Sequence, residues 1–139
     1  MITLEQAQTM IAVARDKGRE MGLKPLSVAV LDAGGHLLAF VREDGASPGR
    51  FEIAQGKAYG AVMLGMPGSA QMKRAEDQAY FMAAVNGAFG GKVIPVPGGV
   101  LVMQGDAVVG AVGVTGDTSD NDAAVAVAGI EAAGFAGKA

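Results

Sequence analysis

Few side chains of this sequence could do chemistry, and their types limit what that chemistry can be. The chain has no cysteine and a single histidine, His36. Disulfides, thiolate metal sites and cysteine nucleophiles are therefore excluded, and a zinc site would need carboxylates or other chains as ligands. His36 is the candidate metal ligand and proton carrier. Because it follows two glycines at a predicted hairpin turn, the alternative is a histidine that only stabilises the turn.

Three charged side chains are candidates for binding an anionic ligand. Arg42 and Asp44 lie at the end of a predicted strand, and a guanidinium group binds a carboxylate through two parallel hydrogen bonds. Lys57 lies among small apolar residues of a predicted helix, where an ammonium group needs a partner because burying it unpaired is costly. That partner is Asp32, Asp44 or a ligand anion. The alternatives are a solvated strand end and a structural Lys–Asp pair.

Glycine-rich strand ends complete the set of candidates. Gly98 and Gly99 would let a ligand approach the backbone, and the hydroxyl of Thr115 can donate or accept a hydrogen bond. Simple turn geometry is the alternative for the glycines. We interpret Asp122, three residues after Ser119, as part of a helix cap that complements the helix dipole. A functional role for Asp122 would be to hold the lysine or a substrate hydroxyl.

The hydrophobic periodicity predicts the elements that must position these residues. Alternation and turn signals predict mainly antiparallel strands with helices on the faces of one five-stranded sheet, an α/β fold of the α+β kind. The expected elements are a helix over about 4–21, strands 26–31 and 36–42, a helix over 50–64, a helix from 69, a short strand 93–96, strands 100–104 and 107–115, and a helix over 120–133. A frayed tail is expected from about residue 134.

Composition excludes several classes of function. The chain has 139 residues, which predicts one domain over 1–139, and its net charge is −3. Basic residues are not clustered and aromatic residues are only 5%, so we expect no nucleic-acid partner. No apolar run reaches the roughly 18 residues of a membrane span. The N-terminus shows no secretory signal pattern, so we expect a cytoplasmic protein.

Several separated blocks of the chain resemble one known family. They are VLDAGGHLLAFVREDGA at 30–46, IAQGKA at 53–58, PGGV at 97–100, GAVGVTG at 110–116 and DA at 122–123. In this order and over nearly the whole chain, they are similar to the recurring blocks of the GlcG/HbpS-like family. Serine is frequent in that family where this chain has Thr115, so the hydroxyl is kept.

The resemblance implies both a fold and a range of functions. The fold is a profilin-like α/β/α sandwich around an antiparallel sheet, in dimers that build into larger rings such as octamers. Some members of the family bind haem. Many others have no established activity and occur among genes for breaking down small organic acids or aromatic compounds.

Two classes of function follow, and the residues leave both open. The first is a haem-binding or small-ligand-binding homo-oligomer, in which Arg42, Arg50 or Lys57 would hold carboxylates and His36, Thr115 or a methionine would face the iron. The second is an enzyme acting on a small carboxylated or aromatic metabolite, or a non-catalytic accessory protein of such a pathway. No nucleophile–base pair of recognised spacing is present. Both classes predict one cleft between the glycine-lined strand ends and the helix that carries the lysine.

Overall fold

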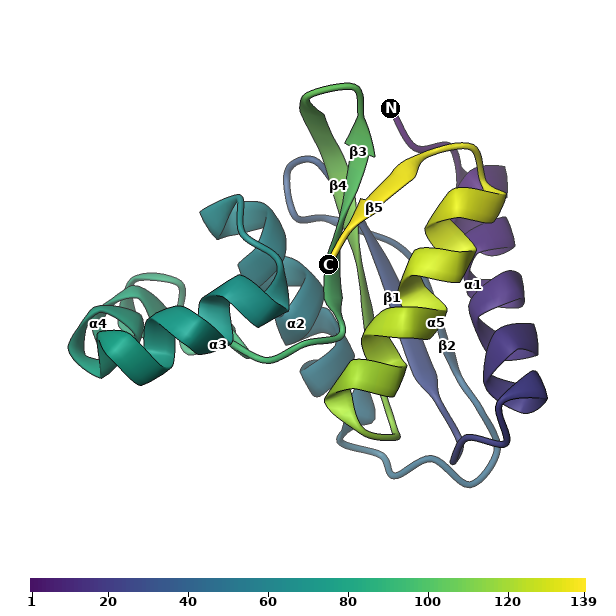
Figure 1. Ribbon diagram of the computed structural model, residues 1–139, viewed down its shortest axis with the longest axis horizontal. Helices are drawn as coiled ribbons and strands as arrows, with labels where there is room; N and C mark the ends of the chain where they lie inside the picture. Colours follow the sequence, from purple (N-terminus) through teal and green to yellow (C-terminus); the bar gives the residue numbers. More distant parts are fainter.

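A computed structural model describes all residues from Met1 to Ala139. Five helices and five strands follow one another along the chain (Figure 1). The elements are α1 (Leu4–Glu20), β1 (Ser27–Asp32), β2 (Leu37–Arg42), α2 (Arg50–Leu64), α3 (Gly68–Asp77), α4 (Ala79–Ala88), β3 (Gly99–Gln104), β4 (Ala107–Thr115), α5 (Ser119–Ala132) and β5 (Ala136–Lys138). The structure confirms the predicted α+β class with five antiparallel strands.

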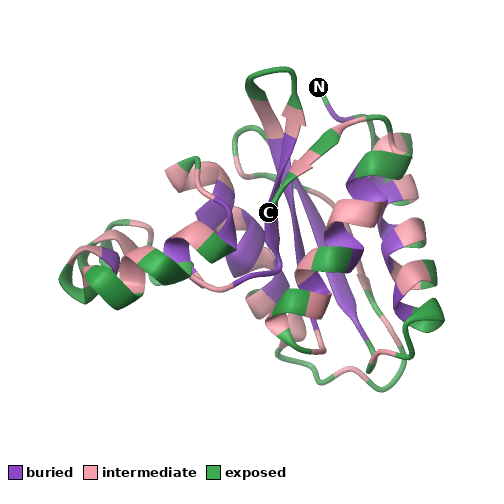
Figure 2. Ribbon diagram, viewed as in Figure 1, coloured by how far each residue is buried: buried purple, intermediate pink, exposed green.

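One sheet with the strand order β2-β1-β4-β3-β5 forms the middle layer of the molecule. Helices α1 and α5 cover one face of the sheet and α2 covers the other (Figure 1). The larger apolar core lies under α1 and α5, and a smaller one lies under α2. Figure 2 shows that buried residues are concentrated in the central strands. The molecule is therefore a three-layer α/β/α arrangement.

Helix α2 packs against the sheet at very short range because its inner face is small. Ala54, Ala58 and Ala61 are fully buried on this face. A side chain at Gly113 of β4 would collide with the carbonyl group of Ala54. The small-residue stripe seen in the sequence thus serves helix–sheet packing, which requires a glycine on the strand below it.

Two of the five helices, α1 and α5, begin with a side-chain cap. At α1 a capping box is present, since the Thr3 hydroxyl accepts from the Gln6 N–H at 3.1 Å and the Gln6 side chain accepts from the Thr3 N–H at 2.9 Å. At α5 the cap is Thr118, whose hydroxyl accepts from the Asn121 N–H at 3.3 Å. The predicted cap at Ser119 is therefore wrong by one residue.

Helices α3 and α4 form an arm that extends from the body (Figure 1). The sequence predicts one helix from Ser69, but the backbone breaks at Gln78, with φ −141° and ψ 65°. Helix α4 contains no charged residue, and Met82 is its only buried residue. An apolar helix with so little of its surface covered is unusual in a single folded chain. No helix of the structure is both long enough and apolar enough to cross a membrane.

The fifth strand is not the predicted one. Residues 93–96 form no strand, and the Ile94 N–H donates to the Gly56 carbonyl of α2 at 3.3 Å. Pro95 has no N–H to contribute to a ladder, which disfavours strand pairing at this point. The sheet is completed instead by β5, where Leu101 of β3 pairs with Lys138. The expectation of a frayed C-terminal tail is wrong for the same reason.

Candidate functional site

A buried ion pair joins α2 to the start of α5. The Lys57 ammonium lies 3.2 Å from Asp122 Oδ2 and donates to the Val114 carbonyl at 2.9 Å. The two side chains are only 4% and 1% exposed. The backbone N–H of Asp117 donates to the other carboxylate oxygen at 3.0 Å. The structure thus places Lys57 in a Lys–Asp pair, with neither charge reachable from solvent in a single chain.

Burial shifts both members of this pair toward their neutral forms. It lowers the pKa of Lys57, while the nearby Asp122 carboxylate acts in the opposite direction. It raises the pKa of Asp122, while the Lys57 ammonium opposes that shift. Gly98 and Gly99 pack directly on this lysine, and a side chain at Gly99 would collide with its carbonyl group. In the single chain, these glycines let β3 approach α2 closely.

A row of polar residues crosses the end of the sheet next to this pair. Ser27 pairs with Arg42 on one side and Thr115 on the other, so all three side chains point to the α2 face. The Thr115 hydroxyl accepts from Arg50 Nη1 at 2.7 Å. Arg50 has no carboxylate within ion-pair distance, and the fully buried Ser27 hydroxyl has no hydrogen-bond partner. Sequence reasoning missed Ser27, whose only signal is a hydroxyl in an apolar run.

Asp44 belongs to another part of the surface. It is exposed and lines a hollow of about 270 Å³ together with Arg15 and Pro25. Its neighbour Glu43 has a structural role, accepting from the Leu26 N–H at 2.8 Å and pairing with Arg15 at 3.1 Å. The structure therefore separates Asp44 from the buried lysine, for which the sequence had made it a candidate partner.

His36 lies at the opposite end of the β1–β2 hairpin. Its side chain is 80% exposed, and its Nδ1 lies 3.2 Å from Asp32 Oδ1. That oxygen also accepts from the backbone N–H groups of Gly34 and His36 at 2.9 Å. The pKa of Asp32 is lowered, mainly by the hydrogen bond that the backbone N–H of His36 donates to its carboxylate. Strand β1 spans about 17 Å, so His36 and Thr115 mark two different ends of the molecule.

The predicted common cleft is absent from the single chain. The structure has five hollows of about 190–350 Å³, and none is lined by Arg42, Lys57 or Thr115. Gly98 and Gly99 line a separate hollow of about 190 Å³. The correction has a physical cause: the small helix stripe and the strand glycines are used to bring α2 and the sheet into contact, which leaves no space between them.

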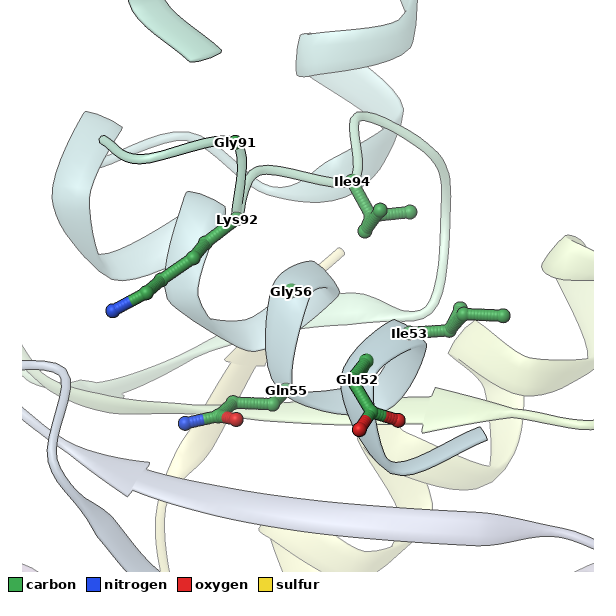
Figure 3. A pocket seen from close by; sticks show the side chains of 7 residues that line it. All are labelled: Glu52, Ile53, Gln55, Gly56, Gly91, Lys92 and Ile94. Carbon is green, nitrogen blue, oxygen red and sulfur yellow. The ribbon is translucent and has the colours of Figure 1, made fainter. Parts of the chain in front are cut away.

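A hollow that sequence reasoning missed lies on the outer side of α2. It measures about 290 Å³ and is lined by α2 and by the segment after α4 (Figure 3). Lys92 and Gln55 extend to one side of it and Ile53 and Ile94 to the other, and Gly56 lets the Lys92–Ile94 segment pack closely on α2. No group of three or more histidine or acidic side chains is placed to hold a metal ion.

Comparison with known proteins gives a consistent result. The family model described as haem degrading protein HbpS-like matches residues 2–131. Protein GlcG of Escherichia coli strain K12 is 33% identical over 119 residues, which covers 83% of this chain and 81% of GlcG.

Solved structures agree with the fold and the family. A double mutant of Streptomyces reticuli HbpS is 32% identical, with a TM-score of 0.79 over 93% of this chain and 84% of that one. A crystal structure of PduOC in complex with haem has a TM-score of 0.86 over 99% of this chain and 98% of that one, and at 20% identity it supports the fold alone. With the model match over nearly the whole sequence, these relatives show that the chain belongs to the HbpS-like family.

Proposed function

We propose that this chain binds haem through His36, at a site completed by another copy of the chain. The observation that carries the proposal is the Asp32–His36 pair, at 3.2 Å, on a side chain that is 80% exposed. Metal-ligating histidines commonly donate their second ring N–H to a carboxylate, which fixes the ring orientation and raises its basicity. Here Nδ1 faces the Asp32 carboxylate, so Nε2 is free to ligate iron.

The residues present fit haem better than a protein-bound metal ion. Haem iron needs only one or two axial ligands from the protein, and the porphyrin supplies the rest. A single oriented imidazole is therefore sufficient, although the chain has no cluster of three metal-ligating side chains. Bound haem would supply a redox-active iron at this turn. Membership of a family described as haem degrading supports this proposal.

The sizes of the hollows support a site shared between copies. Pockets for small molecules usually enclose about 300–1,000 Å³, and the largest hollow of this chain is about 350 Å³. It is lined by α1 and β2 and does not reach His36. A flat ligand as large as a porphyrin would thus need a second surface. The uncovered apolar helix α4 supports assembly into a homo-oligomer. Dimers that build to an octamer are the form that the family resemblance implies.

Titration with haemin tests this proposal. We expect a Soret band that shifts to a defined end point with the wild type and fails to do so with His36→Ala. The matched control is Thr115→Ala at the other end of the sheet, which keeps the Asp32–His36 turn intact. Equal spectra for wild type and His36→Ala, or loss of the band only with Thr115→Ala, would contradict iron ligation by His36.

A second candidate function is binding or conversion of a small carboxylated metabolite at the opposite end of the sheet. The specific observation is that Arg50 has no carboxylate partner and lies on Thr115, in the row that includes Arg42 and the unpaired Ser27 hydroxyl. Guanidinium groups bind carboxylates through two parallel hydrogen bonds. Calorimetric titration with benzoate should show binding that Arg50→Gln removes. Unchanged binding in that variant would exclude this site.

A further inference from the structure

One side of helix α4 is uncharged and is left uncovered by the rest of the chain. The inner side carries the buried Met82 and the half-buried Phe81, whose ring lies 4.1 Å from the guanidinium of Arg74 on α3. The exposed residues recur at helical spacing and form one continuous face. They are Ala79, Tyr80, Ala83, Ala84, Gly87 and Ala88. Figure 2 shows this exposed surface at the end of the arm that lies away from the body, where a second molecule can reach it.

Gly87 is a helix glycine that the fold of the single chain does not require. A glycine within a helix is less favourable than an alanine, so it commonly marks a close approach of another group. At the five other glycines within helices, an added Cβ atom would lie at most 2.8 Å from another part of the chain: Gly18, Gly56, Gly60, Gly68 and Gly129. At Gly87, whose φ is not positive, such an atom would meet nothing within 4 Å. The chain thus leaves open space beside α4 that none of its own residues fills.

Tyr80 is the one large side chain of the same face, and it is 73% exposed. Because seven residues are close to two helical turns, Tyr80 and Gly87 lie on nearly the same line along the helix, about 10 Å apart. A second α4, laid antiparallel on the first and centred between Ala83 and Ala84, would bring each Tyr80 onto the other copy's Gly87. The face therefore carries both a large side chain and the open space that can receive it.

The charges at the two ends of α4 favour this antiparallel arrangement. Glu76 lies just before the helix and Lys92 just after it, and both are exposed and form no ion pair within the chain. Their neighbours Lys73 and Asp77 pair with each other at 2.7 Å. In an antiparallel pair the acidic end of one copy approaches the basic end of the other, whereas a parallel pair would bring like charges together. The helix dipoles favour the antiparallel pair for the same reason.

We propose that α4 packs antiparallel on α4 of a second copy of this chain, across a two-fold axis that passes between Ala83 and Ala84. The Tyr80 ring then fills the space beside the partner's Gly87, and the alanines at the centre let the two helices approach closely. A two-fold interface needs a surface that is complementary to itself, and the match of Tyr80 with Gly87 meets this requirement. This inference rests on the homo-oligomer proposed above, of which it names one interface, and does not depend on haem.

Disulfide cross-linking tests this arrangement, because the natural chain has no cysteine. The two copies of Ala84 would be offset by only about 1.5 Å along the helices, and the two copies of Ala88 by about 13 Å. At close helix packing the two Cα atoms of Ala84 would be about 5–7 Å apart, which suits a disulfide. Under mild oxidation, Ala84→Cys should therefore form a covalent dimer at least about ten times faster than the matched control Ala88→Cys.

A second pair of variants tests the open space at Gly87 itself. Gly87→Leu places its side chain where a single chain has open space, so the fold should tolerate it, but it would occupy the position of the partner's Tyr80. Ala88→Leu adds a side chain of the same kind at the margin of the face and is the matched control. Sedimentation equilibrium should show a dissociation constant for self-association at least about tenfold higher for Gly87→Leu than for Ala88→Leu.

Three results would overturn the inference. They are a monomeric wild type, equal rates of cross-linking at positions 84 and 88, and equal dissociation constants for the two leucine variants. If the wild type is an oligomer and one of the last two results is found, the interface lies elsewhere and the proposed homo-oligomer still stands. Haemin titration of the same proteins tests the haem proposal separately.

Discussion

At the scale of single residues, the Asp32 carboxylate orients the imidazole of His36. Its Oδ1 accepts two backbone N–H groups, which hold it next to Nδ1 of the ring. Replacing a partner of this kind typically weakens metal affinity 10–100-fold. We predict that Asp32→Asn raises the dissociation constant for haemin by about that factor, without the complete loss expected for His36→Ala. Absorption titrations of both variants measure the difference; an unchanged constant for Asp32→Asn would contradict this role.

The buried pair of Lys57 and Asp122 makes a prediction about stability. Breaking a buried ion pair by removing one partner costs about 3–5 kcal/mol, whereas replacing both with apolar groups is often neutral or stabilising by about 1–4 kcal/mol. We therefore expect Lys57→Met to lower the free energy of unfolding strongly and the double variant Lys57→Met, Asp122→Leu to restore it. Urea denaturation measures both. A double variant that is less stable than the single one would show that the pair has a further role.

Asp117 makes a prediction about pH dependence. Hydrogen bonds lower its pKa from 3.8 to about 2, the largest contribution coming from the Asn121 side chain. A carboxyl whose pKa is lowered on folding adds stability above its unfolded pKa, and this stability is lost as the pH falls through the folded value. The destabilisation caused by Asp117→Asn should thus be full above about pH 4 and vanish near pH 2. Denaturation curves at several pH values test this; a difference independent of pH would refute it.

At the scale of elements, the arm formed by α3 and α4 is expected to take part in assembly. Helix α4 has no charge, and its Tyr80 is 73% exposed. We predict that Tyr80→Glu shifts the assembly to smaller species in sedimentation velocity while the melting temperature stays within a few degrees, because exposed substitutions rarely change stability by more than about 0.5 kcal/mol. Met21→Glu, at an exposed apolar residue at the end of α1, is the control. If Tyr80→Glu and Met21→Glu assemble to the same extent, α4 is not part of the interface.

The elements also show what local patterns can and cannot predict. The helices at both ends and the two central hairpins follow from periodicity and capping residues, and the structure confirms them. The strand predicted at 93–96 is wrong because Pro95 and a contact with α2 outweigh its apolar pattern. Strand β5 was missed because the short sequence Ala-Gly-Lys has no strand pattern of its own and forms a strand only by pairing with β3. The break at Gln78 has no glycine or proline to signal it.

At the scale of the whole molecule, the site residues were harder to predict than the fold. The Asp32–His36 contact is local in the sequence and lies in a recognisable turn, although the sequence assigned that aspartate to the lysine as a candidate partner. The pairing of Lys57 with Asp122 joins residues 65 positions apart, so spacing alone could not rank it above the other carboxylates. The common cleft was predicted because residue types show which groups can bind, while packing decides whether space remains between them.

Sedimentation velocity recorded at the Soret wavelength tests the central claim most directly, because only protein-bound haem moves with the protein. With haemin added to the wild type, we expect the absorbing species to sediment as an oligomer, and with His36→Ala we expect the absorbance to stay with slow, free haemin. Haemin that sediments with a monomer, or equally with both proteins, would contradict a haem site built on His36 and completed by a second copy.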